Sequence, residues 1–191
     1  SALASGNPAA VATGTAGQVL TSAGTGAPPV FAAASGFTLG TEQATTSGTA
    51  ITFGSIPSGT KIIYIMFNEV SNNATDDMKV TLGDSGGLET SGYISSGAGV
   101  VNSAATSVTN YTVGFAMKVN DAAKILSGHM ILTLQDSSAF TWVESHCMKA
   151  STTNVMVGGG TKSLSAELTQ LSVVLTHSGA YDAGSLNILY M

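Results

Sequence analysis

The sequence predicts an all-β protein in which an antiparallel, jelly-roll-like sandwich of about eight strands follows an extended N-terminal arm. Strand-like apolar segments separated by turn residues recur from residue 37 onward, and only residues 121–126 resemble a helix. Residues 1–36 contain no charged side chain and consist mostly of Ala, Gly, Ser and Thr. This change in composition divides the chain into an anchoring arm, residues 1–36, and a β-sandwich head domain, residues 37–191.

Residues 61–70 (KIIYIMFNEV) carry the clearest strand signal, because apolar side chains occupy both alternating sets of positions. That pattern predicts a central strand that is covered on both faces. Gly- and Ser-rich segments at residues 89–109 and 158–163 are expected to be surface loops. The other expected strands are residues 50–53, 78–82, 111–119, 130–135, 140–143, 168–177 and 185–191.

The arm is expected to be extended or coil. Asn7-Pro8 and Pro28-Pro29 disfavour a helix, and ordering so many small residues is costly without a docking surface. Apolar side chains are sparse along it, and each is a candidate anchor into a groove on a neighbouring protein. The alternative is a simple linker whose apolar residues are incidental. The six candidate anchors are Leu3, Val11, Val19, Leu20, Val30 and Phe31.

Low charge is the main feature of the composition. Charged residues make up only 9% of the chain, against about 25% in an average domain, while hydrophobic residues make up 43%. Disordered chains are usually poor in apolar residues, so this composition does not indicate disorder. It favours a protein whose surface is largely covered by other subunits, and the alternative is a neutral surface rich in Ser and Thr.

The distribution of charge excludes two classes of partner. The net charge is −5, there is no Arg, and the six Lys residues are scattered singly. Nucleic acids and anionic membranes both require clustered positive charge. No apolar run reaches the ~18 residues of a membrane-spanning helix, so we expect neither nucleic-acid binding nor membrane insertion. Residues 1–36 also lack the positive region and long apolar core of a signal peptide.

One pentapeptide, residues 83–87 (GDSGG), copies the segment around the nucleophile of chymotrypsin-like serine proteases. In that family the histidine and aspartate of the catalytic triad precede the serine in the chain. Here His129, His146 and His177 all follow Ser85, so the family order is impossible. We therefore expect a tight turn at this position, no catalytic residues and no enzymatic activity.

No cofactor or metal is expected. Residues 158–163 (GGGTKS) lack the Gly that precedes Lys in a phosphate-binding loop. Asp76, Asp77 and Asp84 could supply oxygen ligands to Ca²⁺, but their spacing matches no calcium-loop motif. His146 and Cys147 are adjacent, so in a strand they point to opposite faces, and no second Cys completes a zinc set.

Tyr93 and Trp142 are candidate contacts for a receptor or glycan, because exposed aromatic rings stack on sugars. The competing interpretation places them in the core, since aromatic residues are only 6% of the chain and most alternate into predicted core positions.

Gly14–Phe31 (GTAGQVLTSAGTGAPPVF) resembles a short joining segment of bacteriophage tail-fibre and other virion appendage proteins. Phe31 stands where Trp is usual in that segment. The residues that carry the resemblance are Gly14, Gly17, Gln18, Val19, Leu20, Ser22 and Gly24.

Residues 50–191 are similar to a β-domain found at the ends of phage fibres and in small phage structural proteins. The similarity lies in residues 56–59 (IPSG), residues 82–87 (LGDSGG) with Gly92-Tyr93, and residues 182–187 (DAGSLN). This resemblance implies a homotrimer and no catalysis, and it transfers no binding residue.

Together these observations predict a non-enzymatic structural protein on the surface of a phage capsid. It would be a trimeric decoration or cement protein whose arms attach to the major capsid protein or another virion protein. The short arm favours this location over the tail, because a tail fibre usually has a long shaft before its tip. The alternative is a short tail fibre or spike tip that binds a host-surface receptor or glycan.

Overall fold

The computed structural model describes residues 13–34, 36–101, 104–119 and 121–191, and for residues 104–108 it gives the backbone only. The chain divides into two compact units, residues 1–36 and 37–191, at the point where the composition changes. Within the described residues all regular structure is β: sixteen strands in antiparallel sheets. No described helix has the length and apolar character needed to cross a membrane.

The first unit contains a two-stranded hairpin of β1 (Gln18–Thr21) and β2 (Val30–Ala33). These residues are extended, as expected of the arm, but the sequence did not predict that they pair with each other in a regular antiparallel register. Glycines on either side of β1 adopt positive φ angles and allow the chain to turn.

The second unit is a sandwich of two sheets. The nine-stranded sheet has the order β10-β9-β14-β13-β12-β6-β16-β3, with β4 also on β16, and the five-stranded sheet has the order β11-β7-β15-β5, with β8 on β7. The strands of the larger sheet are β3 (Thr38–Leu39), β4 (Gln43–Ala44), β6 (Ile62–Asn72), β9 (Ile94–Val101), β10 (Ala104–Tyr111), β12 (Leu126–Asp136), β13 (Thr141–Lys149), β14 (Asn154–Ser163) and β16 (Tyr181–Tyr190). The strands of the smaller sheet are β5 (Ala50–Phe53), β7 (Met78–Asp84), β8 (Gly87–Leu88), β11 (Phe115–Met117) and β15 (Gln170–Leu175).

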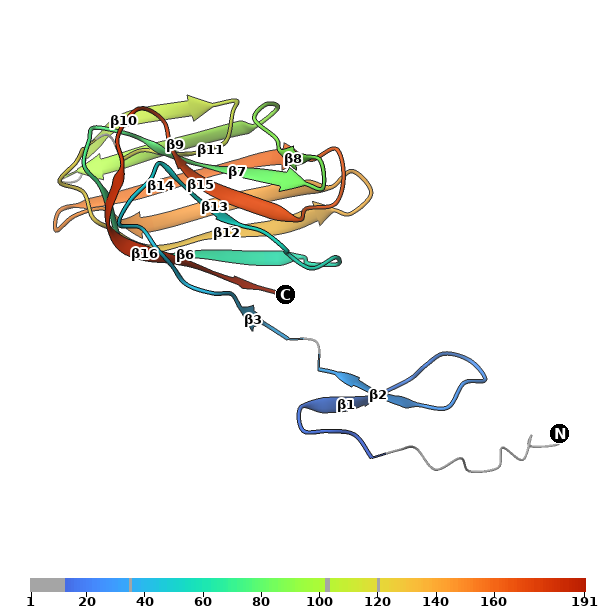
Figure 1. The fold of residues 1–191 in the computed structure, drawn as a ribbon. Helices are drawn as coiled ribbons and strands as arrows, with labels where there is room; N and C mark the ends of the chain where they lie inside the picture. Colours follow the sequence, from blue (N-terminus) through green and yellow to red (C-terminus); the bar gives the residue numbers. More distant parts are fainter. Residues whose placement is uncertain (1–12, 35, 102–103, 120) are drawn as a thin grey trace, which may run out of the picture. The chain divides into compact units, whose positions relative to one another are not determined.

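The chain passes repeatedly from one sheet to the other. Strands β5, β7, β11 and β15 of the smaller sheet alternate along the sequence with strands of the larger one, so the two layers are built from interleaved segments (Figure 1). This alternation is the connectivity expected of a jelly-roll-like sandwich. The predicted all-β, antiparallel sandwich is confirmed, although the described strands are more numerous than the eight expected.

The core lies between the inward faces of the two sheets. On β6, Ile63 and Ile65 are fully buried, and on the smaller sheet Val80, Leu82 and Val173 are fully buried as well. The opposite side chains of β6 are only half-buried. The prediction that this strand is covered on both faces is therefore wrong within the single chain.

Two glycine-rich segments predicted as loops are strands. Residues 94–101 and 104–111 pair as strands β9 and β10, and residues 158–163 belong to β14. These glycines permit close approach rather than turning the chain. A Cβ on Gly97 would lie 2.5 Å from the Ala116 carbonyl oxygen in the other sheet, and one on Gly158 would clash with the His146 ring on the neighbouring strand β13. The helix-like residues 121–126 form a turn that leads into β12.

Candidate functional site

The β1–β2 hairpin is built by residues of the glycine-rich joining segment. Gly17, Gly24 and Gly26 have φ angles of 86°, 102° and 82°, a region that favours glycine. The Gln18 side-chain oxygen accepts a hydrogen bond from the Thr15 backbone N–H at 2.8 Å. The Thr21 hydroxyl donates to the Val30 carbonyl across the two strands at 3.1 Å. Each of these sequence features therefore has a local structural role.

The Phe31 side chain on β2 packs against Gly14, which precedes β1 in the chain. A Cβ added to Gly14 would lie 2.5 Å from the Phe31 ring, so the ring lies directly against the Gly14 backbone. Any side chain at residue 14 would displace the ring. This contact ties together the two ends of the segment that resembles the phage joining motif.

Four apolar side chains of the hairpin remain exposed. The exposed fractions are 45% for Val19, 56% for Leu20, 49% for Val30 and 37% for Phe31. The register places Val19 and Val30 on one face and Leu20 and Phe31 on the other, because directly opposed residues share a face. Both faces of the hairpin are therefore apolar. The other two candidate anchors, Leu3 and Val11, lie outside the described residues.

An isolated two-stranded hairpin is at best marginally stable in water. Among the described residues of this unit, β1 and β2 pair only with each other, so each has an outer edge to which no described strand is hydrogen-bonded. The hairpin thus offers apolar side chains on two faces and hydrogen-bonding groups at two edges. Its chemistry suits binding to a protein surface and includes no acid, base or nucleophile system.

Tyr93, a predicted glycan contact, is buried, with 2% of its surface exposed. Its hydroxyl accepts a hydrogen bond from the Leu82 N–H at 2.7 Å and donates to the Glu89 carbonyl at 3.0 Å. Its ring packs edge-on against Phe115 with 5.1 Å between centroids. Burial raises the pKa of the Tyr93 hydroxyl above its ordinary value. The ring presents no free face to a sugar.

Trp142 is also 2% exposed and points inward from β13. Its indole Nε1 has no hydrogen-bond partner among the described residues. Together with Phe140 it lines a small hollow of about 110 Å³ near the end of the sandwich. The structure thus places Tyr93 and Trp142 in the core rather than on a stacking surface.

Residues 83–87 form a tight turn between β7 and β8, which confirms the turn interpretation. The Asp84 carboxylate accepts hydrogen bonds from the Ser165 hydroxyl at 2.6 Å and the Gly86 N–H at 2.7 Å. The hydrogen bond from Ser165, followed by that from Gly86, lowers the pKa of Asp84. Ser85 is exposed, and its neighbour Asp84 is engaged by the turn rather than by a histidine.

The three histidines are held in separate places. His146 Nδ1 lies 2.5 Å from Glu144 Oε1, and both side chains are fully buried. The His129 ring lies against Tyr64, and His177 contacts Thr176. Sequence analysis missed the Glu144–His146 pair. The strict alternation of residues 141–149 was the available signal, because it places both residues on the same inward face as Trp142.

The acidic candidates for metal binding do not converge. Asp76 accepts a hydrogen bond from the Gly179 N–H at 2.8 Å, whereas Asp77 pairs with Lys118 at 3.0 Å. Cys147 is exposed while His146 is buried, so the two point to opposite faces, as predicted. Across the described parts of the chain, no three His, Cys, Asp or Glu side chains are grouped in a way that could hold a metal ion.

Lys162 is buried beneath the β7–β8 turn and pairs with Glu89 at 2.5 Å. Its ammonium group also lies 5.4 Å from the centroid of the Tyr93 ring. Burial raises the pKa of Glu89, but hydrogen bonds from Lys162 and Ser165 lower it by more, so the carboxyl pKa lies below its ordinary 4.5.

This ion pair predicts a loss of stability in acid. Because the pKa is lower in the folded state, the ionised carboxylate stabilises the fold above about pH 4.5, and this contribution disappears as the pH falls further. Glu89→Gln is therefore expected to lose less stability than the native chain between neutral pH and about pH 3, measured as the urea midpoint of unfolding. Glu42→Gln, at an exposed carboxylate, is the control. Equal acid sensitivity of Glu89→Gln and the native chain would contradict the role of this pair.

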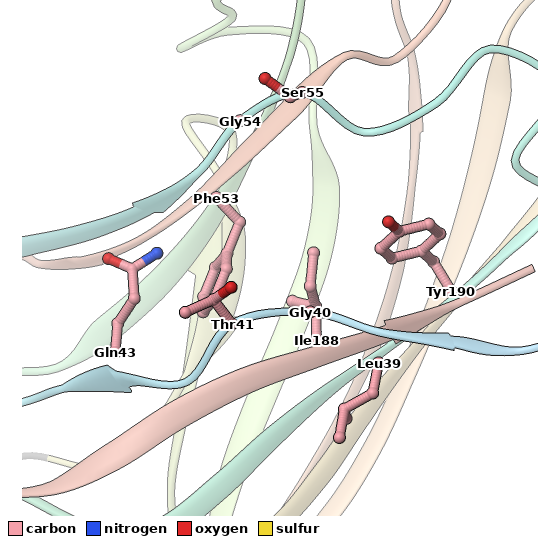
Figure 2. A pocket seen from close by; sticks show the side chains of 9 residues that line it. All are labelled: Leu39, Gly40, Thr41, Gln43, Phe53, Gly54, Ser55, Ile188 and Tyr190. Atoms are coloured by element: carbon pink, nitrogen blue, oxygen red, sulfur yellow. The ribbon is translucent and has the colours of Figure 1, made fainter.

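A hollow with a volume of about 320 Å³ lies at the open edge of the sandwich. Figure 2 shows it between β3–β4 on one side and the end of β5 on the other, with Phe53, Ile188 and Tyr190 facing it. The Gln43 side chain crosses the opening and donates to the Thr52 carbonyl at 2.9 Å. The lining has no charged side chain, so it offers a neutral surface without acid–base chemistry.

No family model, curated protein or solved structure matches this chain.

Proposed function

We propose that this chain is a non-enzymatic virion structural protein: a trimeric decoration protein that the N-terminal hairpin anchors to the capsid surface. The single observation that carries the proposal is the uncharged hairpin with exposed apolar side chains on both faces. A hairpin of this kind gains its stability from the surface that covers it. The partner is the major capsid protein or another virion protein.

The anchoring energy comes from apolar burial and edge pairing. Covering the exposed parts of Val19, Leu20, Val30 and Phe31 contributes about 1 kcal/mol each. A strand of the partner protein can also pair with the backbone at an open edge of the hairpin, and this pairing fixes the register and direction in which the hairpin binds. Three hairpins in one trimer increase the overall affinity for the capsid, because once the first has bound, the second and third bind at a high effective concentration. Since residues 1–36 carry no charge, attachment is expected to resist high salt.

The resemblance of Gly14–Phe31 to a joining segment of phage appendages supports the same role. A tail tip that binds a host glycan would use the same hairpin, but its two predicted aromatic contacts are buried. We therefore place the protein on the capsid, and the particle experiment below would reveal a location on the tail instead.

The test is incorporation into particles of chains with a charged hairpin. Leu20→Asp is expected to reduce the amount of protein per purified particle at least tenfold, because it puts a charge into an apolar contact. Val113→Asp is the matched control, since Val113 is 38% exposed on a head loop, and it should be incorporated normally. Normal incorporation of Leu20→Asp, or of a chain lacking residues 1–36, would overturn the proposal. Electron cryomicroscopy of the native particles then separates capsid density from tail density.

A further inference from the structure

The outer face of the nine-stranded sheet is the side that points away from the five-stranded sheet. On β13 the alternation is strict: Trp142 and Glu144 are buried in the core, whereas Val143, Ser145 and Cys147 point outward. Directly paired residues lie on the same face of a sheet. The residues that pair with these three, strand by strand from β13 to β9 on one side and to β16 on the other, therefore point outward as well. Among the described strands of the head domain, none packs across this face, because the second layer lies on the other side (Figure 1).

This face carries almost no charge. Three rows of register partners cross the sheet through Val143, Ser145 and Cys147, and none contains Asp, Glu, Lys or Arg. Beyond these rows, Lys149 lies at one end of β13 and Asp136 lies near its other end. A neutral centre with charges at its rim is the arrangement typical of protein interfaces.

The same rows are rich in large apolar side chains. Ile94 is 75% exposed at one end of the row through Val143, and Leu39 is 62% exposed at the far edge of the sheet. Figure 2 shows the Leu39 side chain on the opposite side of the ribbon from Ile188 and Tyr190, which face the core. Between these edges, the Tyr64 ring packs edge-on against Phe37, with 5.9 Å between the centroids, and in a tilted arrangement against His129, with 5.8 Å.

The exposed face of an antiparallel sheet is normally polar, because it contacts water. Here β6 carries Ile62, Tyr64 and Met66 outward, all half-buried. With strands about 4.8 Å apart and rows about 6.6 Å apart, the neutral region covers about 500 Å². The rows combine large apolar side chains with neutral polar ones such as Thr133, Ser145 and Thr161. Exposed apolar surface of this kind marks interaction sites, and a standard interface uses about 800 Å² per partner, so the region would form the centre of such an interface.

We propose that this outer face is where copies of the chain pack against one another. A second copy is the partner that fits, because each copy presents the same uncharged rows, so no unpaired charge is buried when the faces meet. A basic partner would find no acidic group there, and an acidic partner would find no cation. The inference rests on the trimer in the proposed function and names the surface that holds it together.

The test uses the full chain and measures its mass in solution by light scattering over a range of concentrations. The native chain is expected to contain more than one copy. Val143→Glu puts a charge in the neutral centre and is expected to weaken association at least tenfold. Ile125→Glu is the matched control, because Ile125 is 43% exposed on a loop before β12, and it should associate normally. Both positions are exposed, so the monomer can fold with either substitution.

Cys147 supplies a second measurement, because its thiol lies within the proposed contact and is exposed in the single chain. In the native assembly, maleimide should label it slowly, and Val143→Glu should restore fast labelling. Leu20→Asp, which disables the hairpin, should leave both mass and labelling unchanged, so failure of anchoring and failure of this interface are distinguishable. A native monomer with fast labelling, or an assembly that Leu20→Asp dissociates and Val143→Glu does not, would overturn the proposal.

Discussion

Glu144→Ala is expected to destabilise the head domain by about 3 kcal/mol, because it leaves His146 buried without its partner. The two side chains meet at 2.5 Å and neither has any exposed surface. Glu144 Oε2 and His146 Nε2 have no other partner among the described residues, so the contact between Nδ1 and Oε1 carries the pair. The measurement is the urea midpoint and slope of unfolding at neutral pH.

A double-mutant cycle separates this pair from general damage to the core. His146→Ala should cost a similar amount, and the double variant should cost much less than the sum, since removing both groups leaves no orphaned polar atom. Ser145→Ala, which changes the exposed residue between them, is the control and should fall within about 0.5 kcal/mol of the native chain. Strict additivity of the two single variants would contradict the coupling.

Gly184→Ala is expected to destabilise the head by a similar amount, about 3 kcal/mol. Gly184 has a φ of 91°, and a Cβ there would lie 2.3 Å from the Glu69 carbonyl oxygen. Both the backbone angle and the neighbouring strand therefore oppose a side chain. Glu69 itself has a φ of 53°, at a point where the β6–β16 register shifts, so neither strand can move aside without disturbing the other.

Gly54→Ala is the matched control for this substitution. Its φ is not positive, and nothing lies within 4 Å of the added Cβ, so the change should stay within about 0.5 kcal/mol. Thermal and urea unfolding of the two variants gives the comparison. Equal stability of Gly184→Ala and Gly54→Ala would contradict this expectation, because it would mean that the irregular pairing of β6 and β16 accommodates the added Cβ at no cost.

The sandwich was predictable because its central strands repeat apolar residues with a period of two. The glycine-rich strands were not predictable, because Gly158 is required by the His146 ring on the neighbouring strand, which leaves no room for a side chain. Periodicity reports which face a residue occupies, but it does not report how closely another backbone approaches. The same limit explains residues 61–70: the sequence shows two apolar faces, and only the fold shows that one of them lacks a covering layer.

The candidate site was predictable in part. Val19, Leu20, Val30 and Phe31 were identified by their isolation in an uncharged segment, and the structure adds that they share two faces of one hairpin. That pairing depends on the positive φ angles of three glycines, which composition alone presents as flexibility.

The short edge strand β3 has a mechanical consequence. Residue 37 begins the head, and the next residues are held to β16 by the pairs of Thr38–Leu39 and by the Gly40 N–H, which donates to the Ile188 carbonyl at 2.7 Å. A force that pulls on the head through residue 36 reaches these few hydrogen bonds first. They would open one after another, followed by the pairs of β4 with β16, in which Gln43 faces Leu186 and Ala44 faces Ser185. Residues 37–49, which have a contour length of about 40 Å, would then be released before the load reached β5. The attachment of the arm would therefore unzip while the rest of the sandwich stayed folded.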